Sequence, residues 1–122
     1  MVDDNDLGLI AKRPIANGAW RANENPNVHS APTNYAEEYF RRAGIMTRLG
    51  DIIDEPKDRI MTSMGYIFSF NDIDVGIIGT QNPKHLLSNI DMYSECLKIS
   101  REVISELNRR FDEFGKNWDQ RT

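Results

Sequence analysis

The stretch that most constrains the fold is residues 74–89, which read DVGIIGTQNPKHLLSN. It begins with a short apolar run, Val75–Ile78, which is typical of a strand buried on both faces. Gly79 breaks this run. Asn82 then offers an N-cap side chain, and Pro83 stands where the first helical residue would be. The pattern predicts a strand, a tight turn and a capped helix in direct succession.

This strand–turn–helix unit is a candidate anion site. Such a unit directs backbone N–H groups and the positive end of a helix dipole toward one point, where phosphate is the usual ligand. A single glycine turn also occurs in many βα units that bind nothing, and the spacing alone does not separate the two cases. The sequence therefore leaves phosphate binding and a purely structural turn as equal alternatives here.

A second short apolar run, Leu7–Ala11, lies near the start of the chain. It ends in Lys12 and Arg13, and Pro14 stops the strand because proline cannot donate to a sheet ladder. Ligands of α/β folds bind at the carboxyl ends of strands, which makes Lys12 and Arg13 candidates for contact with an anion. A solvated basic pair beside a turn is the simpler alternative.

The rest of the chain predicts one loop and four helices. Residues 16–33 are polar and predict a long loop, in which Trp20 is the apolar anchor and His29 lacks a metal-binding neighbour at useful spacing. Helices are expected over Asn34–Leu49, over Asp54–Phe70 with Pro56 in its first turn, after Asn82, and from a cap at Ser94 or Ser100 to Gly115.

Strands that alternate with helices imply an α/β fold with a parallel sheet. Both apolar runs have the composition of strands buried on both faces, and two strands cannot form such a sheet alone. The chain, residues 1–122, is therefore expected to be a single segment of a larger α/β body.

Composition narrows the class of protein further. The chain has 122 residues and a net charge of −4, and its pI near 5.1 argues against nucleic acid and anionic membranes as partners. No apolar run is long enough to span a membrane, and the acidic start lacks the features of a signal peptide. Cys96 is the only cysteine, which favours a reducing, cytoplasmic setting.

Three segments together resemble the C-terminal portion of the aldo-keto reductases. They read LGLIAKRPIANGAW (residues 7–20), DVGIIGTQNPKHLLSN (residues 74–89) and RRFDEFGKNW (residues 109–118), and the likeness covers nearly the whole chain. That family folds as a (β/α)8 TIM barrel and reduces aldehydes and ketones with NADPH. The resemblance implies a partial barrel of about two parallel strands with four helices, whose strands are the seventh and eighth of the barrel.

The resemblance also implies cofactor-binding residues. Thr80 matches a residue that contacts the adenosine 2′-phosphate, Asn89 matches one that hydrogen-bonds the adenine edge, and Arg13–Ile15 match the segment that cradles the pyrophosphate. The full set of expected cofactor-binding residues is Arg13, Pro14, Ile15, Gly79, Thr80, Asn82, His85 and Asn89. The expected cofactor is NADP(H), and no metal is expected.

Several positions depart from the family pattern. Gly79 replaces a lysine of some members, and His85 replaces an arginine that stacks on adenine, so NAD(H) stays open as an alternative cofactor. Lys12 and Arg13 replace the more usual Tyr-Ser pair, which removes the tyrosine that stacks on the nicotinamide. The catalytic Asp, Tyr, Lys and His of the family lie on earlier strands, and no catalytic residue is identified in this chain.

These observations predict the cofactor-binding C-terminal part of an NAD(P)H-dependent, aldo-keto-reductase-like oxidoreductase. A TIM barrel needs about 250 residues and hydride transfer needs a positioned proton donor, so this part is expected to be inactive alone. Whether the chain is itself an enzyme stays undecided. The alternative is a non-catalytic interaction or structural protein derived from a barrel remnant. The expected partners are a second copy of the chain or a complementary N-terminal reductase half.

Overall fold

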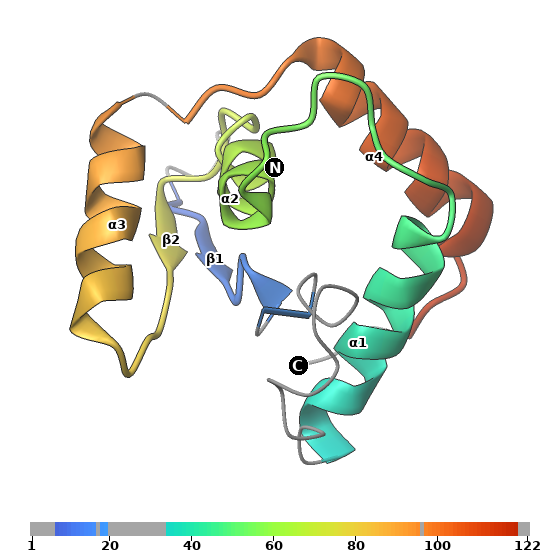
Figure 1. Cartoon of the computed structure of the whole chain (residues 1–122), viewed down its shortest axis with the longest axis horizontal. Coiled ribbons are helices and arrows are strands. Elements are labelled where there is room, and N and C mark those ends of the chain that lie inside the picture. The colour runs from blue at the N-terminus through green and yellow to red at the C-terminus, as the bar shows by residue number, and fades with distance from the viewer. Residues whose placement is uncertain (1–6, 17, 20–33, 96, 120–122) are drawn as a thin grey trace. The chain divides into compact units, whose positions relative to one another are not determined.

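The computed structural model describes residues 7–16, 18–19, 34–95 and 97–119. Within them the chain forms two strands and four helices (Figure 1), in the order β1 (Ile10–Lys12), α1 (Asn34–Thr47), α2 (Arg59–Ile67), β2 (Val75–Ile77), α3 (Pro83–Ser94) and α4 (Arg101–Phe114). The predicted mixed α/β class, with two parallel strands and four helices, is confirmed at this level. The described elements do not form a closed barrel.

The chain divides into two compact units. The first contains residues 1–15 and 56–99, and the second contains residues 16–55 and 100–122. Most of the loop predicted over 16–33, with Trp20 and His29, lies outside the described residues. No helix in the described part of the chain is long and apolar enough to cross a membrane.

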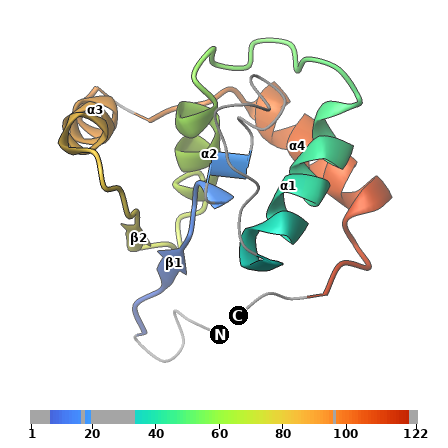
Figure 2. The same ribbon diagram turned by 60° about the horizontal axis from the view of Figure 1, so that its bottom comes forward.

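The first unit is built on the parallel pairing of β1 with β2, which lie side by side in Figures 1 and 2. Ile10 pairs with Val75, and Lys12 pairs with Ile77. The strand was predicted over Leu7–Ala11, but the ladder begins three residues later. The reason is that β2 starts only at Val75, after a turn, so that earlier residues of β1 have no partner strand.

The strand pair is more exposed than its composition predicts. Ile10 is 60% exposed, Val75 is 48% exposed and Ile77 is 56% exposed. The register and the alternation of side chains place these three on one face of the pair. The prediction that both strands are buried on both faces is therefore wrong for the described residues, because about half of each of these three side chains stays exposed.

Helix α2 packs on the opposite face of the strand pair. Its N-cap is Asp58, whose side chain accepts the Ile60 N–H at 2.8 Å. The prediction that the helix begins at Asp54 with Pro56 in its first turn is wrong, since Asp54 has a positive φ of 63° and lies outside the helix. The local cause is Asp58, which supplies the capping acceptor four residues later.

Gly65 is the point at which α2 meets the chain that leaves α3. A Cβ atom on Gly65 would lie only 2.7 Å from Cγ2 of Ile99. Both residues belong to the first unit, and Met64 and Gly65 are buried in α2. The absence of a side chain at Gly65 therefore allows Ile99 to lie directly against the helix.

The second unit is a pair of helices, α1 and α4. Ser100 caps α4, because its Oγ accepts the Val103 N–H at 3.2 Å, and Gly115 follows the last helical residue. Of the two serines predicted as caps, Ser100 is confirmed, whereas Ser94 ends α3 and donates back to the Ile90 carbonyl. The predicted end of the helix at Gly115 is also confirmed.

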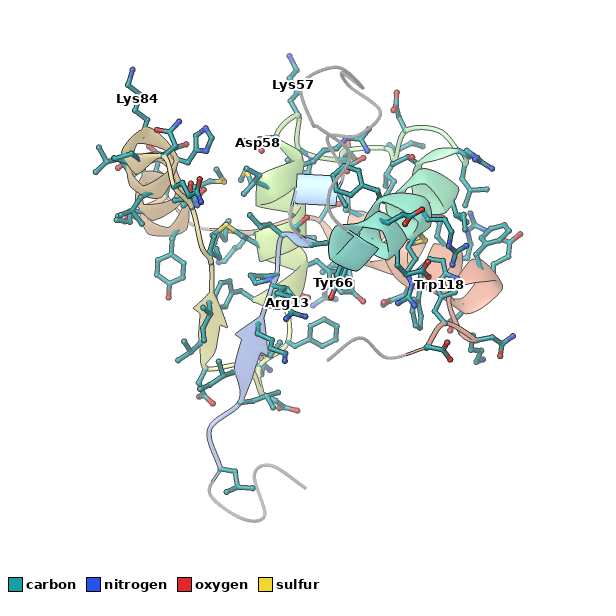
Figure 3. All side chains as sticks on the ribbon, turned by 90° about the horizontal axis from the view of Figure 1, so that it is seen from below. Arg13, Lys57, Asp58, Tyr66, Lys84 and Trp118 are labelled. Atoms are coloured by element: carbon teal, nitrogen blue, oxygen red, sulfur yellow. The ribbon has the colours of Figure 1, made fainter. Side chains whose placement is uncertain are left out.

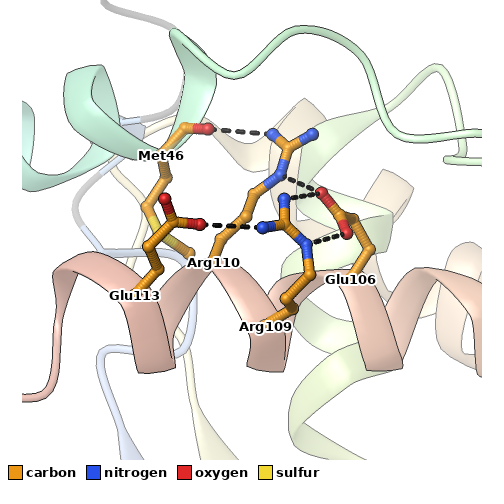
Figure 4. Close-up of polar contacts among 5 residues, drawn as sticks. All are labelled: Met46, Glu106, Arg109, Arg110 and Glu113. Atoms are coloured by element: carbon orange, nitrogen blue, oxygen red, sulfur yellow. Dashed lines mark hydrogen bonds and ion pairs between the residues drawn. The ribbon is translucent and has the colours of Figure 1, made fainter.

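A buried arginine joins the two helices (Figure 4). Arg110 is only 4% exposed, and it donates to the Met46 carbonyl at the end of α1 and to Glu106 on its own helix, each at 2.8 Å. Its neighbour Arg109 also binds Glu106 but is largely exposed. Hydrogen bonds from Arg109 and then Arg110 lower the pKa of Glu106 to about 2, so the carboxylate stays charged.

Helix α1 repeats the same spacing of one glutamate and two arginines. Glu38 accepts hydrogen bonds from Arg41 and Arg42, which lower its pKa to about 2. Arg42 also donates to the Asp119 carbonyl at 2.8 Å, and its guanidinium lies 5.1 Å from the centre of the Trp118 ring. In each helix the second arginine thus ties the helix to a segment distant in sequence.

Replacement of Arg110 by methionine is expected to lower the free energy of unfolding by about 2 kcal/mol, because it leaves the buried Met46 carbonyl without its donor. The matched control is Arg109→Met, which removes two exposed ion pairs, with Glu106 and Glu113, and should cost less than about 1 kcal/mol. Urea unfolding followed by circular dichroism measures both. Equal losses for the two variants would contradict this assignment.

Substitution of alanine for Gly65 should be destabilising by about 1–2 kcal/mol, because the new methyl group must displace the branched side chain of Ile99. Gly44 in α1 is the control, since a Cβ there would meet nothing within 4 Å. Gly44→Ala should stabilise its helix by about 0.5–1 kcal/mol. Thermal and urea unfolding should show a lower stability for Gly65→Ala and a higher stability for Gly44→Ala. A change of stability in the same direction for both variants would refute the packing argument.

Candidate functional site

The parallel register brings the two sequence-predicted phosphate-binding segments to the same end of the strand pair. Lys12 is the last residue of β1 and is paired with Ile77, the last residue of β2. Residues 13–15 and residues 78–82 therefore leave the two strands beside each other. Ligands of α/β folds bind at this carboxyl-end edge of the sheet.

The segment after β1 turns sharply. Arg13 has a φ of 60°, in the left-handed region that non-glycine residues seldom occupy. Pro14 and Ile15 continue the turn, and all three residues are half-buried. Figure 3 shows Arg13 just beyond the end of β1. Lys12 is exposed and is the last residue of β1, so the strand ends one residue later than the predicted end at Ala11.

The turn after β2 is held by its own side chains. The Thr80 Oγ1 accepts the Asn82 N–H at 3.2 Å, and the Asn82 side chain accepts the Lys84 N–H at 3.0 Å. Pro83 occupies the first turn of α3. The predicted strand, turn and helix capped by Asn82 are confirmed.

The same cap changes how an anion can be bound. Pro83 has no N–H, the Lys84 N–H is taken by the Asn82 side chain, and the N–H groups of His85 and Leu86 donate to the Asn82 carbonyl at 3.0 and 3.3 Å. The start of α3 therefore does not present these amides to a ligand. A phosphate at this edge would instead be bound by amides of the turn before Asn82, by basic side chains, and by the Thr80 hydroxyl if it exchanged its long hydrogen bond to the Asn82 carbonyl, 3.5 Å, for the ligand.

A basic side chain that the sequence reasoning did not select also lies at this end of α3. Lys84 is exposed, and Figure 3 shows it pointing outward from the start of the helix. The sequence could have indicated Lys84, because it directly follows Pro83 in the first turn of the helix, and anions bind at the N-terminal ends of helices. Lys84 adds positive charge near Thr80.

His85 and Asn89 lie one helical turn apart on α3, which puts them on one side of the helix. His85 is exposed, whereas Asn89 is half-buried and lines a cleft. The structure thus brings Gly79, Thr80 and Asn82 together in one turn and places Arg13–Ile15 at the same strand end. His85 follows directly in the first turn of α3, where its N–H donates to the Asn82 carbonyl, and Asn89 lies one turn further along the helix.

The cleft is a feature that sequence reasoning missed. It has a volume of about 380 Å³ and lies within the first unit, between α2, β2 and α3. Its lining residues are Met64, Phe68, Asp74, Val75, Gly76, Ile78, Leu86, Asn89, Ile90 and Tyr93. Helix α3 has no buried residue, and several of its side chains form a wall of the cleft.

Comparisons with protein families, with curated proteins and with solved structures find no match to this chain. Within the described residues, no group of three or more His, Cys, Asp or Glu side chains is placed to hold a metal ion.

Removal of the Asn82 cap should loosen α3. We expect Asn82→Ala to destabilise the helix by about 1 kcal/mol, because the Lys84 N–H loses its acceptor. Amide hydrogen exchange in α3 should then be about fivefold faster. Gln81→Ala, one residue earlier, is the control. Unchanged exchange in the Asn82 variant would show that the cap does not hold the helix.

Proposed function

We propose that this chain is the cofactor-binding C-terminal part of an aldo-keto-reductase-like oxidoreductase. The observation that carries the proposal is the register of β1 against β2. It brings the segment after Lys12 and the turn at Thr80 to the same strand end, which is the arrangement that the resemblance requires. The two segments are far apart in the sequence, and only the pairing of β1 with β2 brings them together.

The residues at this edge fit the phosphates of a dinucleotide. Lys12 and Arg13 supply positive charge for a pyrophosphate, and the Thr80 hydroxyl is a donor for a 2′-phosphate. His85 can stack on an adenine ring, and the Asn89 amide can hydrogen-bond its edge. NADP(H) is the proposed cofactor, and a histidine at position 85 in place of the family's arginine leaves NAD(H) as the alternative. When bound, the nicotinamide supplies the hydride.

The chain alone is proposed to bind this cofactor weakly and to be inactive. The amides at the start of α3 are engaged by Asn82, which leaves fewer donors for a phosphate. Reduction of a carbonyl also needs an acid that protonates the developing alkoxide, and the sequence identifies no residue in that role. A complementary N-terminal reductase half, or a second copy of the chain, is the proposed partner.

A second candidate function is a non-catalytic interaction or structural role. The uncovered strand face at Ile10, Val75 and Ile77 favours it, since an apolar face that is not covered within a chain is typical of an interaction surface. The two proposals differ in one measurable property. Only the first requires a dinucleotide to bind at the carboxyl-end edge of the strand pair.

Titration of the full chain with NADPH, followed by amide chemical shifts, tests the first proposal. We expect weak, saturable shifts in residues 13–15 and 79–89. Lys12→Gln and Thr80→Val should each weaken binding by about threefold to tenfold, because each removes one phosphate contact. Lys98→Gln, which removes an exposed lysine of the same unit outside the proposed site, should leave the affinity unchanged.

The same samples report on catalysis. With NADPH present, the isolated chain should not reduce a nitrobenzaldehyde. Saturable shifts that leave residues 79–89 silent would overturn the cofactor proposal and favour the interaction role. Turnover that survives removal of contaminating reductases would overturn the claim that the chain is inactive alone.

A further inference from the structure

The cleft between α2, β2 and α3 has the dimensions of a small-molecule site. Its volume of about 380 Å³ falls at the lower end of the range of such sites. Met64 and Phe68 contribute one wall, Leu86 and Ile90 contribute another, and β2 lies between them. Most of the lining is apolar, so a ligand would place a hydrophobic body here.

Two aromatic residues and one acidic residue are among those that line the cleft. The rings of Phe68 and Tyr93 lie edge to face with their centres 5.6 Å apart. Helix α3 runs back along β2, which brings its last turn, with Tyr93, toward the start of the strand (Figure 1). Asp74 precedes that start, and its Oδ2 accepts the Leu9 N–H at 2.8 Å. Phe68, Asp74 and Tyr93 all line the same cleft.

The aromatic residues and Asp74 together favour a ligand of one charge. Aromatic faces attract cations through the ring quadrupole, and a carboxylate attracts them directly. The lining includes no lysine, arginine or histidine that would compete with Asp74 or attract an anion. The Asp74 carboxylate would repel an anionic ligand, and it would attract a cation more strongly than a neutral ligand, which could only donate a hydrogen bond to it. Charge complementarity therefore points to a cation.

We propose that the cleft binds a small organic cation with an apolar body, of the class of aromatic or alkyl ammonium compounds. The ammonium group lies at Asp74, Phe68 and Tyr93, and the apolar body lies along Leu86 and Ile90. The site goes beyond the proposed cofactor function, with which it shares only Asn89. The two can therefore fail independently.

The probe is benzyltrimethylammonium, and its neutral isostere neopentylbenzene and the anion phenylacetate are the controls. Calorimetry and amide shifts of the full chain should show saturable binding of the cation at millimolar concentrations, with the largest shifts at Phe68, Gly76 and Tyr93. The neutral compound should bind more weakly and the anion should not bind. Saturable shifts outside the cleft, or no saturation, would overturn the proposal.

Variants test the charge itself. Asp74→Asn keeps an acceptor for the Leu9 N–H but removes the charge, and it should weaken binding of the cation about fivefold. Asp72→Asn, an exposed acidic residue outside the cleft, should have no effect. Tyr93→Leu keeps the apolar contact and should weaken binding about threefold. Equal affinities for the Asp74 variant and the original chain, or for the cation and its isostere, would refute a cation site.

Discussion

The register of β1 against β2 is the constraint on which the first unit depends. The Asp74 carboxylate accepts the Leu9 N–H at 2.8 Å, and the Leu9 carbonyl accepts the N–H groups of Asp74 and Val75 at 3.0 and 3.3 Å. These bonds join residues 65 or 66 positions apart. A slip of one residue would turn each strand side chain to the opposite face and would move Lys12 relative to the turn after β2. The carboxyl-end edge of the strand pair and the cleft therefore depend on the same few hydrogen bonds.

Gly76 in β2 allows the ring of Phe68 to pack against the strand. A Cβ atom there would lie 3.0 Å from Cζ of Phe68, so the lack of a side chain lets the ring lie on the strand. Phe68 in turn contacts Tyr93 near the end of α3. Helix α2 has buried residues, but α3 has none. Elements with few buried contacts open most readily, so His85 and Asn89 stand on the less firmly held helix of this unit.

The features that were predicted correctly from the sequence are those that depend on neighbouring residues, above all the ends of helices. Asn82 with Pro83, Ser100 and Gly115 mark helix ends correctly, because a cap depends on a few neighbouring residues. The start of α2 was wrongly predicted at Asp54. The residue that caps the helix is Asp58, four positions later. The extent of β1, the exposure of its face and the cleft could not be predicted, because each depends on residues that are distant in sequence.

The exposed strand face links the two proposed functions. Complete burial of a Val, Leu or Ile side chain is worth about 1.5–3 kcal/mol, and Ile10, Val75 and Ile77 each retain about half of their exposure. A strand or sheet that covers them would gain a few kcal/mol, which is large beside a net stability of about 5–15 kcal/mol. Such a partner would also hold Lys12 and Thr80 in place, because they lie at the end of the same strands. Binding of a partner and binding of a phosphate ligand would then favour each other. Each would order the ends of the strands, and so lower the conformational-entropy cost of binding the other.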